Sequence, residues 1–317
     1  MRSLAPLLVV LLLITGCARE LPAGPEPAPT GWSYTTAYGE TITLASRPDV
    51  IITDAYSAAS LWEYGIRPAG VFGYGLEPDS SPLSLGNADP GQMTVLGRGA
   101  ELDLEAVAAL QPDLIIGYGN EQGDGWTWWD EAMIGQVTEI APFAGIRFGR
   151  PVEQVIDDYA ALAVALGAPA DDPKAAAARA DFDRAKETLR QVAAERPELS
   201  TIAVNADPDQ LYLGSRGLAQ LRLITDLGVR LAGPGVMKDE AWQVLSWELL
   251  PDHPADVVLA HAGSTPVFEE SAAYQSLPAI KAGQAIPWDD KSPYTHVHYA
   301  AWLNQLAELY RSAADVA

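Results

Sequence analysis

The sequence predicts an α/β protein of two lobes, each with a mainly parallel sheet flanked by helices, joined by one long helix. Two observations favour this fold. Short β-rich runs alternate with helical runs from Pro48 to the C-terminus, which is typical of open parallel sheets. Between two series of such runs, residues 173–195 are rich in Ala, Arg, Lys and Glu, and no glycine or proline lies from Lys174 to Arg196.

The first series of runs predicts one lobe. Residues 113–117 (Asp-Leu-Ile-Ile-Gly) are apolar at successive positions, as a strand covered on both faces requires. Residues 102–110 predict a helix, because Asp103 is placed to cap its start and Pro112 follows its end. By the same reasoning we expect strands at 50–53 and 69–72, a helix at 58–64, and one more helix–strand step over 134–143.

The second series repeats this order and predicts the other lobe. We expect strands at 201–204, 256–259 and 285–287, and helices at 218–227, 247–250 and 300–313. In the run between the series, apolar residues such as Phe182 and Leu189 recur at steps of three and four, so one face of a helix packs. At 1.5 Å per residue this helix would be about 30–35 Å long. A surface helix within a single domain is the alternative.

The composition excludes several classes of protein. The 317 residues are 48% hydrophobic and 20% charged, a balance that supports a buried core and excludes disorder over most of the chain. The formal net charge of −22 would repel a phosphate backbone, so we expect no nucleic-acid partner. The single cysteine, Cys17, excludes an intramolecular disulfide and a Cys-based zinc or iron–sulfur site.

The N-terminal residues predict export and a lipid anchor. A short positive start and the apolar run 4–14 match the central region of a secretory signal. Ile14-Thr15-Gly16-Cys17 resembles a bacterial lipobox, so we expect residues 1–16 to be removed and Cys17 to carry acyl chains that hold the protein on the extracytoplasmic face of the cell membrane. The proline-rich start of residues 17–45 predicts an extended tether, followed by a first strand. An ordinary signal peptide is the alternative.

Five stretches in this order resemble the substrate-binding proteins of ABC importers for iron–siderophores, heme and cobalamin. The most specific is 102–116, which contains Leu-Asp-Leu-Glu and Leu-Gln-Pro-Asp-Leu. The others are 47–51, 65–71, 246–248 with 255–258, and 277–285. The resemblance implies the helical-backbone periplasmic-binding fold, with lobes at 46–170 and 198–317, an interlobe helix at 171–197, and a ligand held between the lobes.

The resemblance also implies a partner. Glu105 of the first lobe and Glu248 of the second would contact arginines of the permease dimer of an ABC importer. Two carboxylates far apart on a rigid body suit a two-fold partner of opposite charge. From the residues alone, Glu105 is an acid in the first turn of a helix, where the helix dipole favours it.

Most candidate ligand-binding residues lie in loops after predicted strands, because the carboxyl ends of parallel strands form the usual ligand edge of open sheets. Arg98 lies just before the predicted helix 102–110, and Trp242, four residues before Ser246, is a position at which the resemblance implies a ligand-facing tryptophan. In the first lobe the candidates are Tyr74, Arg98, Trp126, Trp128 and Trp129. In the second lobe they are Tyr212, Arg216, Trp242, Trp288 and Tyr294, the last two expected at the rim of the cleft. One or two of the three tryptophans in the glycine-rich loop 123–129 can be structural, but we do not expect all three to be buried. Such an aromatic site suits a bulky ligand with apolar and polar parts.

Charge favours one ligand class within this resemblance. A tris-catecholate iron complex is strongly anionic and needs several converging cations, whereas hydroxamate complexes are neutral or cationic and tolerate an acidic protein. Hydroxamate binders of the family also carry an arginine near the position of Arg98. We therefore expect a ferric siderophore of hydroxamate type as the ligand and no resident cofactor, with heme or cobalamin as the alternative.

A direct metal-ion binder, an enzyme and a receptor or scaffold are rival interpretations. All four histidines, His253, His261, His296 and His298, lie in the second half, whereas a metal importer needs ligands from both lobes. His296 and His298 have ligand-like spacing for a strand, or else mark the start of the last helix. The sequence has no nucleophile-elbow, phosphate-loop or zinc-protease motif. Asp289 and Asp290 form an adjacent acid pair, which we expect to point apart in a loop.

Overall fold

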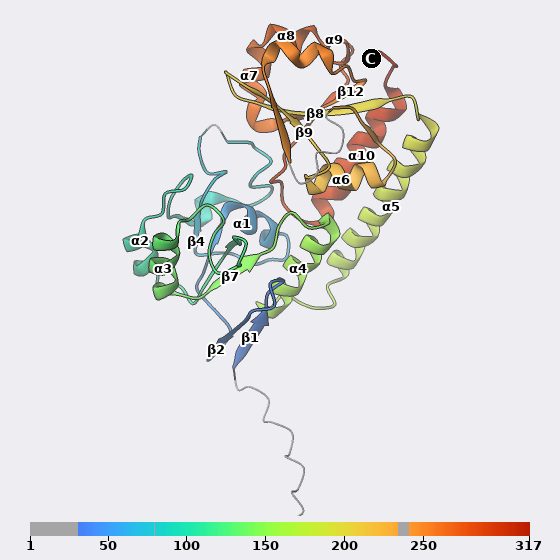
Figure 1. Ribbon diagram of the computed structural model, residues 1–317. Coiled ribbons are helices and arrows are strands. Elements are labelled where there is room, and N and C mark those ends of the chain that lie inside the picture. Colours follow the sequence, from blue (N-terminus) through green and yellow to red (C-terminus); the bar gives the residue numbers. More distant parts are fainter. Residues whose placement is uncertain (1–30, 79, 234–240) are drawn as a thin grey trace, which may run out of the picture. The chain divides into compact units, whose positions relative to one another are not determined.

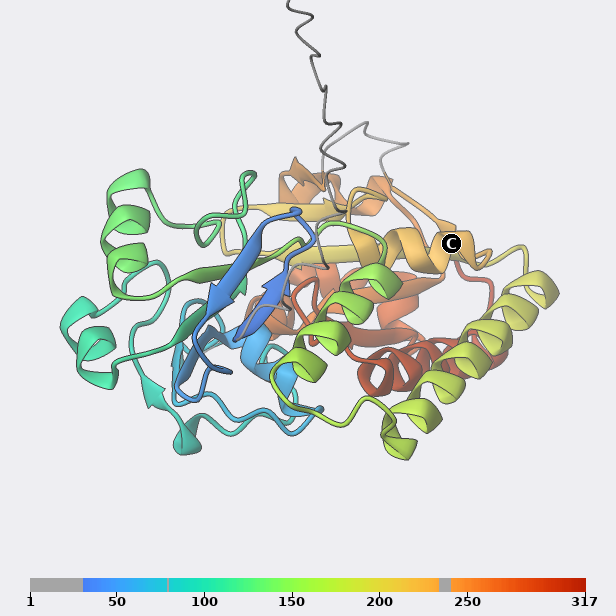
Figure 2. The ribbon, with the colours of Figure 1, turned by 90° about the horizontal axis from the view of Figure 1, so that it is seen from below.

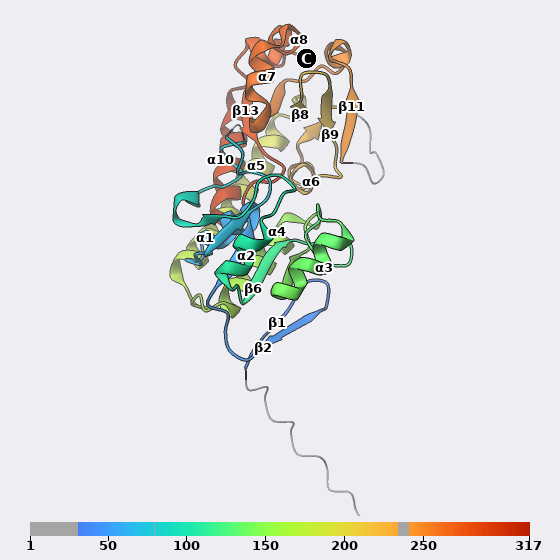
Figure 3. The same ribbon diagram turned by 90° about the vertical axis from the view of Figure 1, so that its left-hand side faces the viewer.

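Two sheets, one in each half of the chain, organise the computed structural model, which describes residues 31–78, 80–233 and 241–317 (Figures 1 and 3). The first sheet is entirely parallel in the order β5-β4-β3-β6-β7. Its strands are β3 (Ile51–Asp54), β4 (Gly70–Phe72), β5 (Thr94–Val95), β6 (Leu114–Tyr118) and β7 (Phe143–Ile146). Every residue of β3 and β6 is buried, which explains their apolar runs.

The helices of the first lobe begin where sequence capping signals lie. Asp54, Asp103 and Asp130 each accept a backbone N–H in the first turn of the helix that follows. The elements are α1 (Ala55–Trp62), η1 (Pro90–Gln92), α2 (Leu104–Leu110), α3 (Glu131–Ile140) and α4 (Val152–Ala165). We did not predict α4. An antiparallel hairpin of β1 (Trp32–Thr35) and β2 (Thr41–Leu44) precedes the lobe and packs against α4.

The second sheet is mixed, in the order β11-β9-β8-β12-β13, with β10 also paired to β8. Its strands are β8 (Ser200–Ala206), β9 (Leu211–Gly214), β10 (Arg230–Leu231), β11 (Trp242–Leu245), β12 (Val257–His261) and β13 (Ala285–Trp288). Strands β9 and β11 run antiparallel to their neighbours. The turn between β8 and β9 is too short for a crossover helix, so β9 returns antiparallel. Asp207 stabilises this turn by accepting the N–H groups of Asp209 and Gln210.

Short helices cover the second sheet and one long helix ends the chain. They are α6 (Ala219–Asp226), η2 (Trp247–Asp252), η3 (Ala262–Ser264), α7 (Thr265–Glu270), α8 (Ala272–Ser276), α9 (Pro278–Lys281) and α10 (His296–Ser312). Helix α10 begins four residues before the predicted start, because Thr295 caps it by accepting the His298 N–H. His296 and His298 therefore lie in the first turn of a helix and not in a strand.

The predicted long helix is α5 (Pro173–Glu195), which links the two lobes. Asp172 caps its start, and Phe182, Leu189 and Val192 of its apolar face are buried. Helix α10 lies alongside α5 (Figures 1 and 2). The fold is thus the two-lobed α/β fold with a helical backbone that the sequence predicts.

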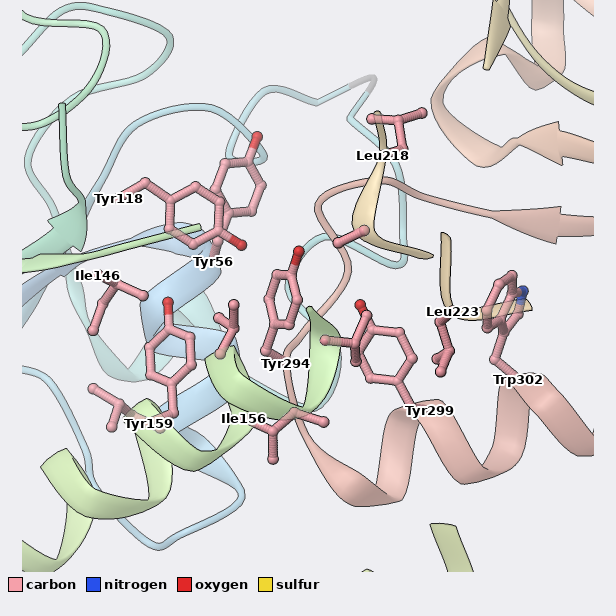
Figure 4. Packing of buried hydrophobic residues seen from close by; sticks show 14 of the residues in the cluster. Tyr56, Tyr118, Ile146, Ile156, Tyr159, Leu218, Leu223, Tyr294, Tyr299 and Trp302 are labelled. Atoms are coloured by element: carbon pink, nitrogen blue, oxygen red, sulfur yellow. The ribbon is translucent and has the colours of Figure 1, made fainter. Parts of the chain in front are cut away.

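One buried core continues from lobe to lobe. Figure 4 shows tyrosines from α1, β6, α4 and α10 in a row that crosses the junction, with Tyr294 between Tyr56 and Tyr299. The rings of Tyr56 and Tyr118 lie 5.2 Å apart, and those of Tyr294 and Tyr299 lie 5.7 Å apart. Because close-packed cores resist deformation, this shared core limits independent motion of the lobes.

The predicted signal peptide, Cys17 and the proline-rich tether lie outside the described residues. Within the part of the chain that the structure describes, no helix has the length and apolar character needed to cross a bilayer.

Candidate ligand-binding site

Aromatic side chains gather at the carboxyl edge of the first sheet. Tyr74 follows β4 by two residues, Phe148 follows β7 by two, and Trp128 lies in the loop after β6. Tyr74 and Phe148 are 36% and 39% exposed, and Trp128 is partly exposed. Trp128 lies between the other two, with ring centroids 5.4 Å from Tyr74 and 6.4 Å from Phe148. We call Tyr74, Trp128 and Phe148 the aromatic patch.

The three loop tryptophans differ in burial. Trp126 is fully buried and Trp129 is 8% exposed, so only Trp128 offers a ring face to a ligand. Trp126 occupies a slot between two glycines: a Cβ at Gly73 or Gly117 would lie 2.8 or 2.9 Å from its ring. Trp126 therefore supports Tyr74 and Trp128 of the patch from the core side, and Trp129 packs behind Trp126.

A buried carboxylate holds this loop in place. Asp54, the last residue of β3, accepts hydrogen bonds from Trp126 Nε1 at 2.9 Å, from the Tyr118 amide at 2.8 Å and from the Ser57 amide at 2.7 Å. Burial raises the pKa of Asp54, and these hydrogen bonds oppose that rise. Asp54 thus connects α1, β6 and the tryptophan loop at one point.

A network of charged residues lies at the carboxyl edge of the second sheet. His261 ends β12, and Asp289, Asp290 and Lys291 follow β13. His261 Nε2 lies 3.5 Å from Asp289 and 3.2 Å from Asp290, and Lys291 Nζ lies 3.1 Å from Asp290. The expectation that Asp289 and Asp290 point apart is therefore wrong, because the parallel pairing of β12 with β13 brings His261 between their carboxylates.

The first lobe joins this charged network directly. Ser84, in the loop after β4, donates to Asp289 at 3.0 Å. The same junction has a hydrogen bond from the Tyr294 amide to Ser60 of α1, at 3.0 Å. The network and the aromatic patch are close neighbours, since a Cβ at Gly75 would lie 3.1 Å from the Cβ of Ser84. The two lobes thus contribute an aromatic part and a charged part to one region.

His261, Asp289 and Asp290 have the composition of a metal site, and their ligand atoms lie within 4.8 Å of one another. Two features oppose metal binding. Lys291 already supplies a cation at 3.1 Å from Asp290. In the neutral ring Nδ1 of His261 accepts the Gly263 amide, which leaves the proton on Nε2. The charged ring gives up this hydrogen bond but also has a proton on Nε2, so neither form offers a lone pair there to a metal. The chemistry of the group is that of a compensated ion network.

The stability of the protein should depend on the charge of His261. Burial opposes protonation, but hydrogen bonds and charge from Asp289 and Asp290 raise the pKa of His261 to about 9. Protonated His261 therefore stabilises the fold fully below its unfolded pKa of about 6.5, and this contribution is lost as the pH rises through 9. We expect the free energy of unfolding in urea to fall by roughly 2–3 kcal/mol between pH 6.5 and 9.5.

A His261→Gln variant is the control for this pH dependence. His296 and His298 have lowered pKa values and titrate below this range, so the variant should show an almost flat profile from pH 6.5 to about 8.5. Above that pH, stability falls in both proteins alike, because burial raises the pKa of tyrosines such as Tyr56, Tyr118 and Tyr294 in the folded state. An equal fall in the variant would assign the pH dependence to another group.

The other candidate residues of the second lobe lie in different surroundings. Trp242 is partly exposed and its ring lies 5.8 Å from that of Trp288. Trp288 and Tyr294 are 1% and 3% exposed, so they form part of the core and not the rim of a cleft. Trp288 instead supports the charged network, with its ring edge-on to His261 at 6.2 Å.

Two further candidates are engaged elsewhere. Tyr212 lies within β9 and donates to Asp207 of its own hairpin at 2.6 Å. Arg216 pairs with Asp226 at 2.7 Å and is exposed. Neither shows a contact with the aromatic patch. Arg98 is better placed: its Nε donates to the Leu76 carbonyl, and its neighbour Gly99 lies beside the Tyr74 ring.

The two docking candidates are both exposed. Glu105 lies in the first turn of α2, and Glu248 lies in the first turn of η2. Backbone and Ser246 hydrogen bonds lower the pKa of Glu248, so it stays charged well into the acid range. Neither carboxylate has an ion-pair partner among residues 31–78, 80–233 and 241–317.

Two cavities lie away from the aromatic patch. One of about 200 Å³ lies between α4, α5 and α6, and one of about 430 Å³ lies between α4 and the start of α5. The first is lined mainly by aliphatic and charged side chains, and the lining of the second also includes Tyr64 and His296. We place the candidate site at the patch because exposed aromatic rings and a charged network meet there.

Several residues of this region escaped prediction from the sequence. Phe148 occupies the same position after β7 that Tyr74 occupies after β4, which is a signal that could have identified it. Asp54 is an acid at the end of an apolar strand, which marks it as a cap but not as the support of Trp126. For His261, nothing local indicates that it meets Asp290, which lies 29 residues further along the chain.

Two α/β lobes on a common helix, with an aromatic and charged site at the strand ends, define a binding protein. Residues 76–292 match the periplasmic binding protein family, and the chain belongs to that family. The family is one of binding proteins that work outside the cytoplasm, which confirms that the chain is not an enzyme. No curated protein sequence matches the chain.

Solved structures share the fold over nearly the whole chain. DesE, a ferric-siderophore receptor protein from Streptomyces coelicolor, is 29% identical with a TM-score of 0.83, and the match covers 90% of this chain and 100% of DesE. FhuD from Vibrio cholerae, solved with Fe³⁺-Desferal, is 20% identical with a TM-score of 0.61, covering 83% of this chain and 99% of FhuD. The iron uptake ABC transporter substrate-binding protein PiuA from Streptococcus pneumoniae is 18% identical with a TM-score of 0.62, covering 90% and 100%.

Proposed function

We propose that the chain captures a ferric siderophore of the hydroxamate class at the aromatic patch and delivers it to the permease of an ABC importer. The observation that carries this proposal is the patch itself, with the charged network of the other lobe beside it. Stacked and exposed rings suit a bulky ligand with apolar linkers, and polar groups nearby suit its oxygen atoms. The similarity to a ferric-siderophore receptor protein over the whole chain supports the same class of ligand.

The charges near the patch favour hydroxamate over catecholate ligands. Lys291 and His261 are matched by Asp290 and Asp289, and Glu77 lies beside the loop that carries Arg98. Arg216, expected to contribute a cation, is paired with Asp226. A trianionic complex would find few uncompensated cations here, whereas a neutral or cationic trihydroxamate needs none.

Binding of ferric desferrioxamine B, a trihydroxamate complex, tests the proposal. Trp128→Ala should weaken binding about 10- to 100-fold in calorimetric titrations, because it removes the central ring of the patch. Trp247→Ala is the matched control: Trp247 is also partly exposed, but it lies in η2 and contacts Phe268. The proposal fails if the chain binds ferric catecholates, heme or cobalamin more tightly than ferric trihydroxamates.

Anchoring through Cys17 is the second part of the proposal. It is supported by the lipobox-like sequence and by the extracytoplasmic location of the family. Cys17→Ala should move the protein from the detergent-soluble membrane fraction into the medium or periplasm, since acyl chains supply stable anchoring. Fractionation with an antibody to the chain measures this, and a variant that stays in the membrane fraction would rule out lipidation at Cys17.

A further inference from the structure

The half-exposed end of the charged network has unused hydrogen-bonding capacity. The Lys291 side chain is 35% exposed, and among the residues that the structure describes its ammonium group contacts the two oxygens of Asp290, at 3.1 and 3.3 Å. Asp290 is 10% exposed, whereas Asp289 is 2% exposed and already accepts from Ser84 and from the Lys291 amide. An ammonium group has three N–H donors, so Lys291 retains at least one donor for an oxygen atom outside the network.

This end of the network lies beside the aromatic patch. Ser84 connects the two, since it donates to Asp289 and also lies against Gly75, the residue after Tyr74. Tyr74 lies near enough to Lys291 for a charge on its phenol oxygen to raise the pKa of the lysine. A ligand that covers the rings of the patch therefore meets Lys291 and Asp290 from the other lobe.

The network presents hydrogen-bond donors without a net positive charge. Lys291 is paired with Asp290, and His261 lies between Asp289 and Asp290. A site of this kind can bind the oxygen atoms of a neutral complex, but it cannot compensate the charge of a strongly anionic one. Neutralising one member of the Lys291–Asp290 pair would leave the network with one net charge next to the ligand.

We propose that Lys291 and Asp290 contact the ligand and set the net charge of the ferric complex that the protein accepts. This inference rests on the proposed function and specifies its ligand: a complex with a net charge of zero or one positive charge. Lys291→Gln should make the site more negative and shift its preference towards the cationic complex. Asp290→Asn should shift the preference in the opposite direction.

A matched pair of ligands isolates charge from shape. Ferric desferrioxamine B carries one positive charge on its terminal ammonium, and its N-acetyl derivative is neutral with the same iron core. The measured quantity is the ratio of their dissociation constants for each variant. We expect Lys291→Gln to change this ratio about three- to tenfold in favour of the cationic complex, and Asp290→Asn to change it by a similar factor in favour of the neutral one.

Two exposed residues that precede β12 and β13, at the ends opposite the charged network, provide controls with the same changes of charge. Lys281→Gln at the end of α9 and Asp252→Asn at the end of η2 should leave the ratio within twofold of the unmodified protein, because solvent and salt screen distant surface charges. Thermal unfolding checks the fold of every variant. Lys291→Gln is the decisive variant if Asp290→Asn fails to fold, because Lys291 is the more exposed partner.

The outcomes separate this inference from the proposed function. Opposite shifts in the two variants support the inference. If the unmodified protein binds both complexes but the ratio is unchanged in Lys291→Gln, or moves in the same direction in both variants, the inference is wrong and the proposed function stands. If the unmodified protein binds neither complex, the proposed function fails and this inference fails with it.

Discussion

A double variant, Glu105→Arg with Glu248→Arg, should bind its ligand with unchanged affinity and fail to support uptake. Both carboxylates are exposed and lie in first turns of separate helices, one in each lobe. If they contact arginines of the permease, reversal of both charges replaces two attractions with two repulsions, and like-charge pairs at an interface cost several kcal/mol. We therefore expect uptake to fall at least 100-fold.

The folded state should tolerate these changes. Glu105 is stabilised at the start of α2 by the helix dipole, which an arginine forfeits at a cost of about 0.3–1 kcal/mol. The measurement is uptake of radioactive iron in the organism of origin with its own gene replaced, next to binding affinity of the purified protein. Glu139→Arg with Glu308→Arg carries the same change of charge at other exposed sites on α3 and α10. Normal uptake by the first variant, or equal loss by the control, would contradict the docking role.

Trp126→Ala should be the most destabilising single change in the binding region. The side chain is fully buried, lies against Phe72, Tyr74 and Trp129, and donates to Asp54 at 2.9 Å. Removing a buried tryptophan leaves a cavity, and such changes cost about 3–5 kcal/mol. Loss of this support should also displace Tyr74 and Trp128, so ligand affinity should fall together with the free energy of unfolding.

Two comparisons define the origin of this effect. Trp128→Ala removes a partly exposed ring and should cost about 1 kcal/mol of stability or less, while still weakening binding. Trp126→Phe keeps most of the ring volume but loses the hydrogen bond to Asp54, so it should cost about 1–2 kcal/mol. Urea unfolding of the three variants measures the order. A Trp126→Ala variant no less stable than Trp128→Ala would show that Trp126 does not support the loop.

For the tryptophan loop, the sequence predicts the position in the sheet but not which ring faces outward. Three tryptophans in a glycine-rich loop after a predicted strand indicated a binding region, and they lie at the carboxyl edge of the first sheet. Which of them faces outward depends on Gly73, just after β4, and Gly117 of β6, which make room for Trp126 on either side of β3. That choice is made by residues that are distant in the chain, so no local pattern predicts it.

The charged network was not predicted from the sequence. Asp289 and Asp290 looked like a divergent pair in a loop, yet both carboxylates lie near His261. Parallel pairing of β12 with β13 places His261 opposite Trp288, one residue before the pair. Ser84 then reaches Asp289 across a separation of 205 residues along the chain.

Local patterns in the chain were sufficient for the alternating elements, the helix α5 with its buried face, and the assignment of two lobes, because hydrophobic period and capping depend on residues only a few positions apart. The antiparallel strands β9 and β11 were decided by pairing within the second sheet. The burial of Trp288 and Tyr294, and the approach of the aromatic patch to the charged network through Ser84, were decided by tertiary packing. Those contacts join segments that lie far apart in sequence, and their geometry exists only once both sheets share one core.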